Sequence, residues 1–516
     1  MPIISSLIST LASKASVNHD LTLPSSPWPY IVSFIIITLT LLLPHLKSPP
    51  SYTPPGCRKL GLPRSKSNLN DEFAPEYAHG ASSTSKNDSN NNPNSPPYRI
   101  KALFTYPIKS CTGVELDTAE VIETGLKYDR LFSFAEFIEN PPSSLCADAQ
   151  PAPPSSTPQT GEWIARTLRN RTFNTLALLT PEIWIPDPSS PTYAPDLPSV
   201  QSSGVLLLKY PRVSPSPLTS LLVTLHLLPD HLALPLPLTP PPTKVSDFPL
   251  TPIKIWKDSP LAYDYGHLIP ASLWTFLASG PESSPAPTSK SKSTPQNKRK
   301  LTLFRSHPHH PREIFRCAPS KDDIGFQPST GFADAYPLHL LNLASVRDVA
   351  EKCAAQIPRL SVRRFRANVI VTGPGRFEED DWKRIFVPTS HPHGYGDGGN
   401  GDENGNGNGN GSGGDRVMDG NGDRAGVEIH TVCRTIRCQL PNVDPDTGSR
   451  HRNEPERTLR GYRCIDPGDK GSCLGMQLVP GVREFTLRVN DPISVLETGE
   501  HFYIKMLAPG EKVEGV

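Results

Sequence analysis

Two short groups of residues in the first half of this 516-residue chain combine a cation with a polar neighbour. Lys109, Ser110 and Cys111 follow a strand-like run that turns at a proline. An ammonium, a hydroxyl and free backbone donors at a strand end are suited to binding phosphate. Asp129 and Arg130 form the second group, which closes a short strand pair. The alternative for both groups is a solvated lysine and a surface ion pair, which is the commoner fate of such residues.

The second half of the chain offers an arginine run and a set of cysteines. The sequence RRFRAN at 363–368 places three guanidinium groups beside a strand, which indicates an anion site, a solvated face or, with denser aromatic residues, a nucleic-acid patch. Cys433 and Cys438 precede the polar turn NVDPDTG. With Cys464 and Cys473 they could hold zinc, but the spacings x4 and x8 fit the usual ligand pairs poorly.

Composition limits what these groups can belong to. The 60 prolines among 516 residues, about 12 %, exceed the usual share of about 5 %. Only 36 % of the residues are hydrophobic, so we expect an ordered core of about 300 to 350 residues with insertions. An all-helical bundle and a wholly disordered chain are both excluded. The net charge of +1 supplies no field for nucleic acid, and nine cysteines fit a reducing compartment better than a disulfide scaffold.

The elements that must position these groups are mostly strands. Apolar and polar residues alternate from Tyr98 to Ser110, and a capping serine opens a predicted helix at 345–357. Short predicted strands separated by Pro/Ser-rich stretches favour a mainly β fold with some α (α+β), a barrel or sandwich with surface insertions. The further strands predicted between residues 111 and 280 are 114–122, 131–137, 174–179, 204–209 and 222–228.

The N-terminal region predicts a membrane anchor. Residues 28–46 read WPYIVSFIIITLTLLLPHL, long enough to cross a hydrocarbon core as one transmembrane helix. Basic residues follow the span from Lys47, so the positive-inside rule places the bulk of the chain in the cytosol. The alternative is a cleaved signal peptide, but the basic n-region and the small-residue cleavage site are missing. We therefore expect a single-pass membrane protein, with the mitochondrial outer membrane as one candidate location.

Low-complexity segments separate the predicted ordered parts. Residues 1–27 precede the span, and the Ser/Asn/Pro-rich residues 47–97 predict a disordered tether. Residues 281–300 predict a basic linker. The Gly/Asn/Asp-rich residues 391–425 predict a disordered insertion, since no strand and helix flank their glycines as a nucleotide loop requires.

The order of seven motifs resembles a known family. They are YPIKSCTGVEL, GLKYDRLF, WKDSPLAYDYG, FADAYPLHLL, RFRANVIVTG, FEEDDWKRI and RCQLPNVDPDTG. In this order they resemble the MOSC family with its N-terminal β-barrel domain, and most closely the mitochondrial amidoxime-reducing components and their bacterial and fungal relatives. The resemblance implies an N-terminal MOSC β-barrel domain at 98–280 and a MOSC β-barrel domain at 301–516.

The resemblance also implies a molybdenum cofactor, a pterin dithiolene with a phosphate tail. In such proteins the cysteine before the VDPDTG-type turn binds the metal, and a soft thiolate suits that role. The cofactor-binding positions carried over from the family motifs are Lys109, Ser110, Arg130, Arg366 and Asn368, and the catalytic metal ligand is Cys438.

Three positions depart from the family pattern. Ala367 replaces the family's proline between Arg366 and Asn368, and a tyrosine of close relatives falls on or near Gln477. Cys433 precedes Cys438 by five residues where relatives have a cysteine three before, so we assign it no metal role.

Three functions follow as hypotheses. The first is a membrane-anchored molybdenum-dependent reductase of N-oxygenated small molecules, with electrons from a cytochrome b5-type donor and its reductase. No haem, flavin, iron–sulfur or pyridoxal-phosphate motif is found in the sequence, so the electrons must come from a partner. The second is a sulfur carrier or cofactor-handling protein of the MOSC type. The third is a non-enzymatic membrane scaffold.

Overall fold

A computed structural model describes most of the chain from Tyr52 onward. The described residues are 27–28, 31, 33–34, 52–78, 98–139, 161–213, 216–225, 227–278, 300–388 and 426–505. The predicted span 28–46 lies almost wholly outside them, as do the predicted insertion 391–425 and nearly all of the linker 281–300. Among the described residues, no helix combines the length and apolar character needed to cross a bilayer.

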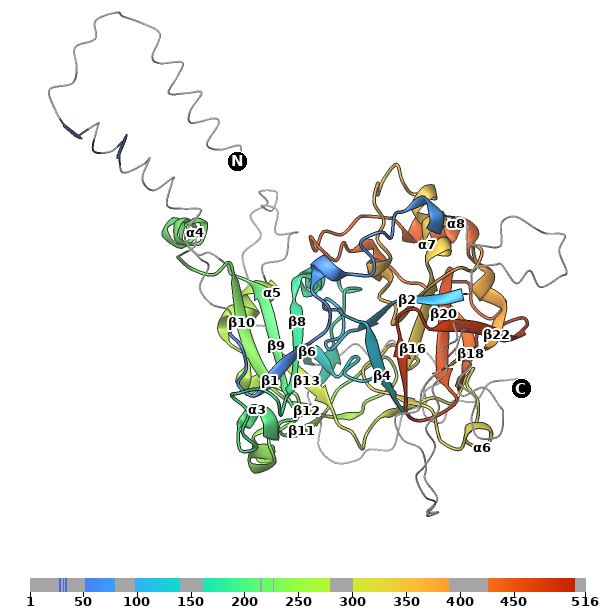
Figure 1. Cartoon of the computed structure of the whole chain (residues 1–516), viewed down its shortest axis with the longest axis horizontal. Helices are drawn as coiled ribbons and strands as arrows, with labels where there is room; N and C mark the ends of the chain where they lie inside the picture. The colour runs from blue at the N-terminus through green and yellow to red at the C-terminus, as the bar shows by residue number, and fades with distance from the viewer. Residues whose placement is uncertain are drawn as a thin grey trace, which may run out of the picture. The chain divides into compact units, whose positions relative to one another are not determined.

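A closed barrel forms the larger of the β structures (Figure 1). Its strands follow one another around the sheet, and the pairing of the first with the seventh closes it. Residues of β16 and β17 pair in parallel, whereas the other pairs are antiparallel. In sheet order the strands are β17 (Val369–Thr372), β16 (Leu338–Asn342), β20 (Cys473–Pro480), β19 (Val427–Ile436), β18 (Trp382–Val387), β22 (Pro492–Thr498), β2 (Tyr98–Thr105) and, beyond the closure, β3 (Val114–Leu116).

Smaller sheets complete the β structure. A sheet of five strands contains β11 (Leu250–Pro252), β12 (Leu261–Asp264), β13 (Leu301–Ser306), β6 (Phe132–Glu139) and β7 (Gly161–Ala165). A sheet of four contains β1 (Cys57–Leu60), β8 (Thr180–Pro186), β9 (Val205–Pro211) and β10 (His231–Pro237). The remaining pairs involve β21 (Phe485–Arg488), β4 (Thr118–Ile122), β5 (Gly125–Leu126), β14 (Arg312–Glu313) and β15 (Ser329–Thr330). The prediction of a mainly β fold with barrels is confirmed.

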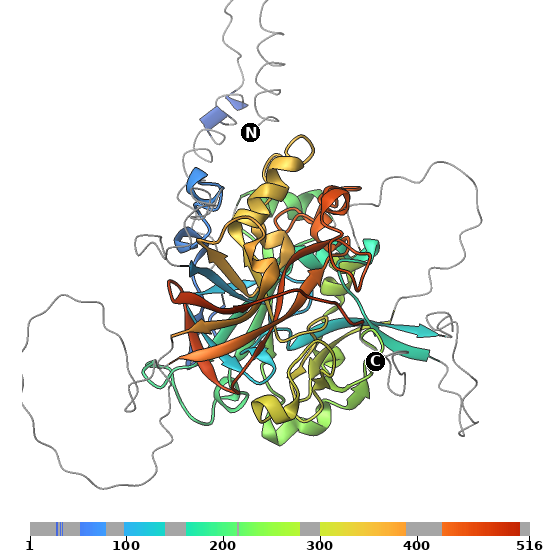
Figure 2. The ribbon, with the colours of Figure 1, turned by 90° about the vertical axis from the view of Figure 1, so that its right-hand side faces the viewer.

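The α-helices among the described residues are all short. The principal one, α7 (Leu343–Lys352), packs on the barrel against β16, β17 and β20 (Figure 2). Its apolar residues Leu343, Val346 and Val349 are buried with Ala102 and Leu474 of the barrel. The others are α3 (Pro198–Gln201), α4 (Pro217–Thr224), α5 (Ala271–Ala278), α6 (Lys321–Ile324) and α8 (Glu456–Tyr462).

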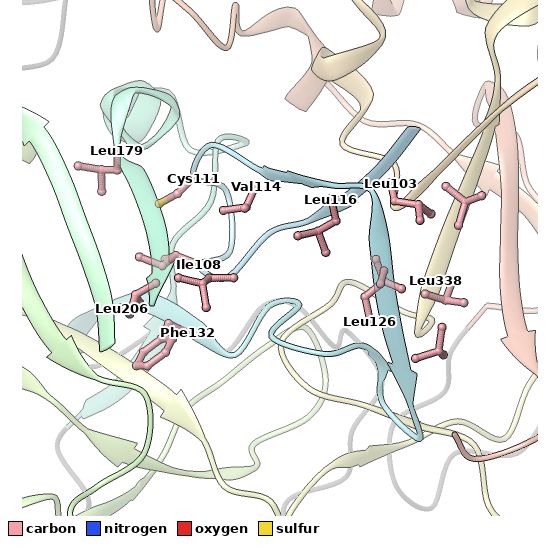
Figure 3. Close-up of a cluster of buried hydrophobic side chains, with 14 of the residues drawn as sticks. Leu103, Ile108, Cys111, Val114, Leu116, Leu126, Phe132, Leu179, Leu206 and Leu338 are labelled. Carbon is pink, nitrogen blue, oxygen red and sulfur yellow. The ribbon is translucent and has the colours of Figure 1, made fainter. Parts of the chain in front are cut away.

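One apolar core runs between the sheets. Figure 3 shows it from Leu206 of β9, through Ile108 and Phe132, to Leu126 and Leu338. Cys111 lies inside this core, fully buried, and burial raises the pKa of its thiol. The residue after Lys109 and Ser110 is therefore a core residue, not a ligand.

Strand pairing links the two predicted domains. β13 pairs with β6 and β12 of the first predicted domain, although it opens the second in sequence. β2 opens the first predicted domain in sequence, but it pairs with β17 and β22 of the closed barrel. Sequence order therefore does not separate the sheets. β3 of the first predicted domain also joins the sheet of the closed barrel through β2, and β4 of the first pairs with β21 of the second.

Several local predictions need correction. The predicted tether 47–97 is wrong for residues 52–78, where β1 pairs with β8 from Cys57↔Pro186 to Leu60↔Ile183. The predicted strand 174–179 is a 3₁₀ turn, η5 (Arg171–Leu178), and 222–228 overlaps α4, because apolar runs of this length fit either structure. The predicted helix 345–357 begins earlier, as α7, because Asn342 and not Ser345 caps it.

Candidate cofactor site

Two arginines share one aromatic ring at the inner part of the candidate site. The guanidinium carbons of Arg130 and Arg366 lie 4.7 Å and 4.4 Å from the centre of the Tyr106 ring. Tyr106 is buried and its hydroxyl donates to the Ala367 carbonyl at 3.3 Å. Burial raises the pKa of Tyr106 to about 12, so the ring stays neutral and its face attracts both cations. Tyr106, Arg130, Arg366 and Asn368 are called the arginine cradle below.

Hydrogen bonds fix Arg130 from several sides. Its Nη1 donates to Asp129 Oδ2 at 2.5 Å and to Asn368 Oδ1 at 3.0 Å, and its Nη2 donates to the Arg366 carbonyl at 3.0 Å. Burial raises the pKa of Asp129, although Arg130 opposes this effect, so the carboxylate depends on its partner. The predicted residues Arg130, Arg366 and Asn368 therefore lie together.

Asn368 is a positioning residue in this arrangement. Its Nδ2 donates to the Phe104 carbonyl at 3.1 Å, and its Oδ1 also accepts from the His339 backbone N–H at 3.2 Å. The amide thus joins β2, β16 and the segment before β17, and it orients Arg130.

Arg366 differs from Arg130 because its charge is incompletely satisfied. Its Nη2 is buried and has no hydrogen-bond partner among the described residues. Burial lowers the pKa of Arg366, and the neighbouring Arg130 lowers it further. A buried cation with an unsatisfied donor lowers the stability of the folded state unless an anion binds to it.

Strained backbone concentrates around this site. Among the described residues, nine non-glycine residues have a positive φ, and four of these are Ser110 (69°), Arg130 (45°), Trp256 (57°) and Arg366 (57°). The left-handed conformation costs roughly 1–2 kcal/mol for residues other than glycine. Strain of this kind is found at ligand sites, where the surrounding contacts enforce it.

The arginine run divides between two tasks. Arg363 forms a bidentate pair with Asp446 at 3.0 Å and 2.6 Å, and Arg364 pairs with Asp444 at 2.5 Å. Both acids belong to the NVDPDTG turn that follows Cys438. Two of the three predicted guanidinium groups therefore hold this turn, and only Arg366 enters the cradle.

Lys109 is buried, and its charge is already paired. Its Nζ donates to Asp334 Oδ1 at 2.5 Å and to the Phe332 carbonyl at 2.9 Å. Burial lowers the pKa of Lys109 against the effect of Asp334. The charges of Lys109 and Arg130 hold the pKa of Asp334 below its ordinary value. Ser110 lies beside this pair, where its Oγ accepts from the Leu168 N–H at 3.2 Å.

An exposed rim extends from this ion pair. The indole N–H of Trp256 donates to Asp334 Oδ1 at 3.3 Å, and the Arg169 guanidinium lies 4.5 Å from the Trp256 ring centre. The Asp334 side chain is 57 % exposed and Trp256 is 49 % exposed. Arg169, Trp256 and Asp334 are called the exposed rim below.

Cys438 lies within electrostatic reach of the exposed rim and of Arg437. Burial raises the pKa of its thiol and Asp334 adds to this effect, whereas the charges of Arg169 and Arg437 lower it. Arg437 in turn donates from Nη2 to His339 Nε2 at 2.6 Å and from Nη1 to the Phe365 carbonyl at 3.3 Å. Arg437 therefore lies between Cys438 and His339.

His339 is buried near the cations Arg437 and Arg130 and is uncharged. Burial and the charges of Arg437 and Arg130 hold its pKa well below the ordinary value. Gly475 of β20 permits the close packing here, since its φ is 77° and a Cβ would lie 2.4 Å from the Leu340 carbonyl.

The net charge of the cluster favours an anion. Asp129 and Asp334 are the acids that pair within it, while its cations are Lys109, Arg130, Arg366, Arg437 and, at the rim, Arg169. The cations therefore outnumber the acids by three, which favours an anion such as a phosphate monoester. The structure brings all six predicted site residues into this one region.

Sequence reasoning missed several members of the cluster. Tyr106, Trp256, Asp334 and His339 assume no predicted role, although each stands inside one of the quoted motifs. Their position inside these motifs was the one feature of the sequence that could have identified them as site residues. Arg169 lies outside every quoted motif, so only the structure finds it.

A comparison with known proteins finds one family similarity. Residues 98–140 match the family described as "MOSC N-terminal beta barrel domain". This segment contains Lys109, Ser110, Asp129 and Arg130 and includes the strand β2. The resemblance drawn from the motifs is therefore confirmed, with the family model matching this segment of the chain.

The relatives narrow the class further. The chain is 26 % identical over 208 residues to "Mitochondrial amidoxime-reducing component 1" of Mus musculus, covering 38 % of this chain and 46 % of the relative. The Homo sapiens protein of that name is 27 % identical, with 38 % and 47 % covered. "Mitochondrial amidoxime reducing component 2" of Bos taurus is 29 % identical over 139 residues, with 27 % and 30 % covered. The matches span less than half the length of these relatives.

Proposed function

We propose that this protein is a molybdenum-cofactor-dependent reductase of N-hydroxylated small molecules. The observation that carries the proposal is the buried Nη2 of Arg366, which has no partner among the described residues and lies in a cluster with more cations than acids. The names of the similar proteins, which describe amidoxime reduction, support the choice of reaction class.

The cradle fits the anionic end of such a cofactor. Arg366 offers an unused donor, and Arg130 is held beside it by Asp129 and Asn368. Charge-assisted hydrogen bonds from two guanidinium groups suit a phosphate, because their planar forks match its oxygens. Lys109 and Ser110 would complete this contact from the other side, with Asp334 as the alternative partner of Lys109.

Cys438 is the proposed metal ligand. Its pKa is raised by burial, so an unliganded thiol stays protonated, and metal binding would replace this proton. Arg364 and Arg363 hold the turn behind it through Asp444 and Asp446, which keeps the sulfur in place. When bound, the molybdenum centre would supply the two electrons that cleave the N–O bond of the substrate.

The exposed rim is the proposed substrate side. Trp256 offers a partly exposed indole surface, and Asp334 has a second carboxylate oxygen beyond the one that Lys109 and Trp256 occupy. An aromatic face and a carboxylate together suit a planar substrate whose nitrogen group is protonated. The rim would orient this group toward Cys438.

Electrons and location complete the proposal. The reaction consumes two electrons and two protons for each N–O bond and releases one water. We propose a cytochrome b5-type donor with its reductase as the source of these electrons. We also propose that residues 28–46 anchor the chain in a membrane, from their apolar sequence alone.

A sulfur-carrier function is less well supported. A carrier cysteine must be a nucleophile, which requires a lowered thiol pKa. The pKa of Cys438 is raised by burial, which is the opposite direction. The scaffold hypothesis leaves the buried charges of Arg366 and Arg437 without a reason.

Turnover of a defined substrate tests the proposal. Purified full-length protein, loaded with molybdenum cofactor, is given benzamidoxime and a chemically reduced dye as electron donor. We expect benzamidine to form with the wild type and at least a hundredfold more slowly with Cys438→Ser. Equal rates for both chains, or no product with a fully loaded wild type, would refute it.

A further inference from the structure

One buried arginine links the two segments that carry the exposed rim. Arg312 lies in β14, and its side chain is 5 % exposed. Its Nε donates to Asp258 Oδ2 at 2.6 Å, two residues after Trp256. Its Nη1 and Nη2 donate to the main-chain carbonyls of Ala333 and Asp334 at 2.6 Å and 3.3 Å. The three nitrogens of one guanidinium group therefore bind both sides of the rim.

The Trp256 side of the rim is a tight turn. Ile255 and Asp258 exchange two backbone hydrogen bonds, at 2.9 Å and 3.1 Å, which leaves Trp256 and Lys257 at the tip. The φ of Trp256 is 57°, a conformation that is unfavourable for a residue with a side chain. Such a turn keeps its shape only while the surrounding contacts enforce it. The ion pair of Asp258 with Arg312 is one of these contacts.

The Asp334 side is held through its main chain as well as its side chain. Lys109 donates to one carboxylate oxygen of Asp334, whereas Arg312 donates to the carbonyl of the same residue. Arg312 also donates to the carbonyl of the buried Ala333. Two different cations thus fix Asp334, which restricts the direction of its second carboxylate oxygen.

The shape of the guanidinium group is suited to this link. Its donors lie in one plane in a rigid fork, so the partners of one arginine hold fixed positions relative to one another. Lysine carries a single nitrogen on a flexible stem, so it would hold at most one side of the rim in place. The link therefore depends on the geometry of the side chain at 312 and not on its charge alone.

We infer that Arg312 is a positioning residue that fixes the Trp256 ring relative to the Asp334 carboxylate and thereby sets the affinity of the rim for planar amidinium groups. An amidinium group presents two parallel N–H donors to a carboxylate, and a flat cation also binds to an indole face. Both contacts form together only while the ring and the carboxylate keep their spacing. The inference rests on the substrate side of the proposed function, but its test does not require turnover.

Hydrogen exchange of the full-length protein, followed by mass spectrometry, tests the link itself. With Arg312→Met, peptides from 253–260 and from 331–336 should both lose protection, because both lose a hydrogen-bond donor. With Asp258→Ala, only 253–260 should lose protection, since Arg312 still binds the carbonyls on the other side. Arg305→Met is the matched control and should change neither segment. Arg305 is also a buried arginine, but it donates to the Leu238 and Ser306 carbonyls.

Calorimetric titration of the same chains with benzamidine measures the consequence for binding. Arg312→Met and Asp258→Ala should each raise the Kd about tenfold, because binding must then order a loosened side chain. Arg312→Lys keeps the charge and should resemble Arg312→Met, whereas Arg305→Met should keep the wild-type Kd.

Several results would overturn the inference. They are no binding of benzamidine by the folded wild type, a wild-type Kd in Arg312→Met or in Arg312→Lys, and a loss of protection in Arg312→Met that is confined to one segment. Failure of the proposed function gives a different result. If wild type loaded with cofactor binds benzamidine with the expected dependence on Arg312 but does not reduce benzamidoxime, only the proposed reaction is refuted.

Discussion

The arginine cradle and the exposed rim lie in one site but are built in opposite ways. In the cradle, Arg130 is held by three partners and a ring, so its position is fixed before any ligand arrives. In the rim, Trp256 is held by one hydrogen bond at 3.3 Å and one guanidinium. Under the proposed function, the rigid part would retain the cofactor and the accessible part would exchange substrate and product.

Removing Arg130 should have the largest effect on the cradle. Arg130→Ala leaves Asp129 buried without its partner and should lower the free energy of unfolding by about 3–5 kcal/mol. Arg366→Met removes a cation that has an unpartnered nitrogen, so stability should change by less than about 1 kcal/mol. Urea unfolding of the cofactor-free chains measures both values. Equal destabilisation by the two changes would mean that Arg366 is satisfied within the protein.

Replacing Cys438 should separate chemistry from cofactor retention. Cys438→Ser exchanges a soft ligand for a harder oxygen, while the cradle stays intact. We expect at least a hundredfold loss of turnover, retention of most of the pterin, and one fewer sulfur neighbour in the molybdenum X-ray absorption spectrum.

Cys433→Ser is the matched control for that change. Cys433 is buried in a cluster with Ile314, Tyr336 and Val479, none of which belongs to the cradle, so turnover should stay near wild type. If Cys433→Ser abolished turnover and Cys438→Ser did not, the ligand assignment would be wrong.

His339 predicts a pH dependence that belongs to the cradle. Because its pKa in the folded chain is well below 6.5, the unfolded chain binds the extra proton as the pH falls below 6.5. Stability should therefore decrease by about 1.4 kcal/mol per pH unit there. Glu379 has the opposite sign, since burial raises its pKa to about 7 and its contribution falls as the pH rises from about 4.5 to 7.

The difference between wild type and His339→Gln isolates the histidine from Glu379. Glutamine can still accept the hydrogen bond from Arg437. The extra loss of wild-type stability below pH 6.5 should be missing in the variant, as measured by urea unfolding at pH 5, 6 and 7. Parallel pH profiles of the two chains would mean that His339 is protonated in the folded state.

Trp256 should give the smallest effect, confined to the rim. Trp256→Ala removes a half-exposed ring, so pterin content and stability should stay close to wild type. The KM for a planar substrate should rise about tenfold, equivalent to about 1.4 kcal/mol, with kcat little changed. Loss of pterin in this variant would mean that Trp256 helps to hold the cofactor, as is proposed for the cradle.

The same contrast explains what the sequence could predict. The motifs around Lys109, Arg130 and Arg366 are short and continuous, and their types already indicate an anion site. Their assembly depends on strands far apart in sequence, such as β2 against β17, which spacing alone does not reveal. Asp334 and His339 gain their importance only through these pairings.

Other misses have local causes. Residues 57–60 looked like tether because four residues carry little periodicity, and their strand exists only through β8. The three arginines of RRFRAN looked equivalent, but the turn at Asp444 and Asp446 takes two of them. In both cases the structure depends on tertiary contacts that the residue types alone do not reveal.

Molybdenum and pterin content of the purified full-length protein tests the central claim most directly. Elemental analysis and fluorescence of the oxidised pterin are measured on wild type and Arg366→Met, produced side by side in cells that make the cofactor. The account predicts about one molybdenum and one pterin per wild-type chain, and less than a tenth of both in the folded variant. A folded wild type without molybdenum and pterin, or a variant that retains both in full, would contradict it.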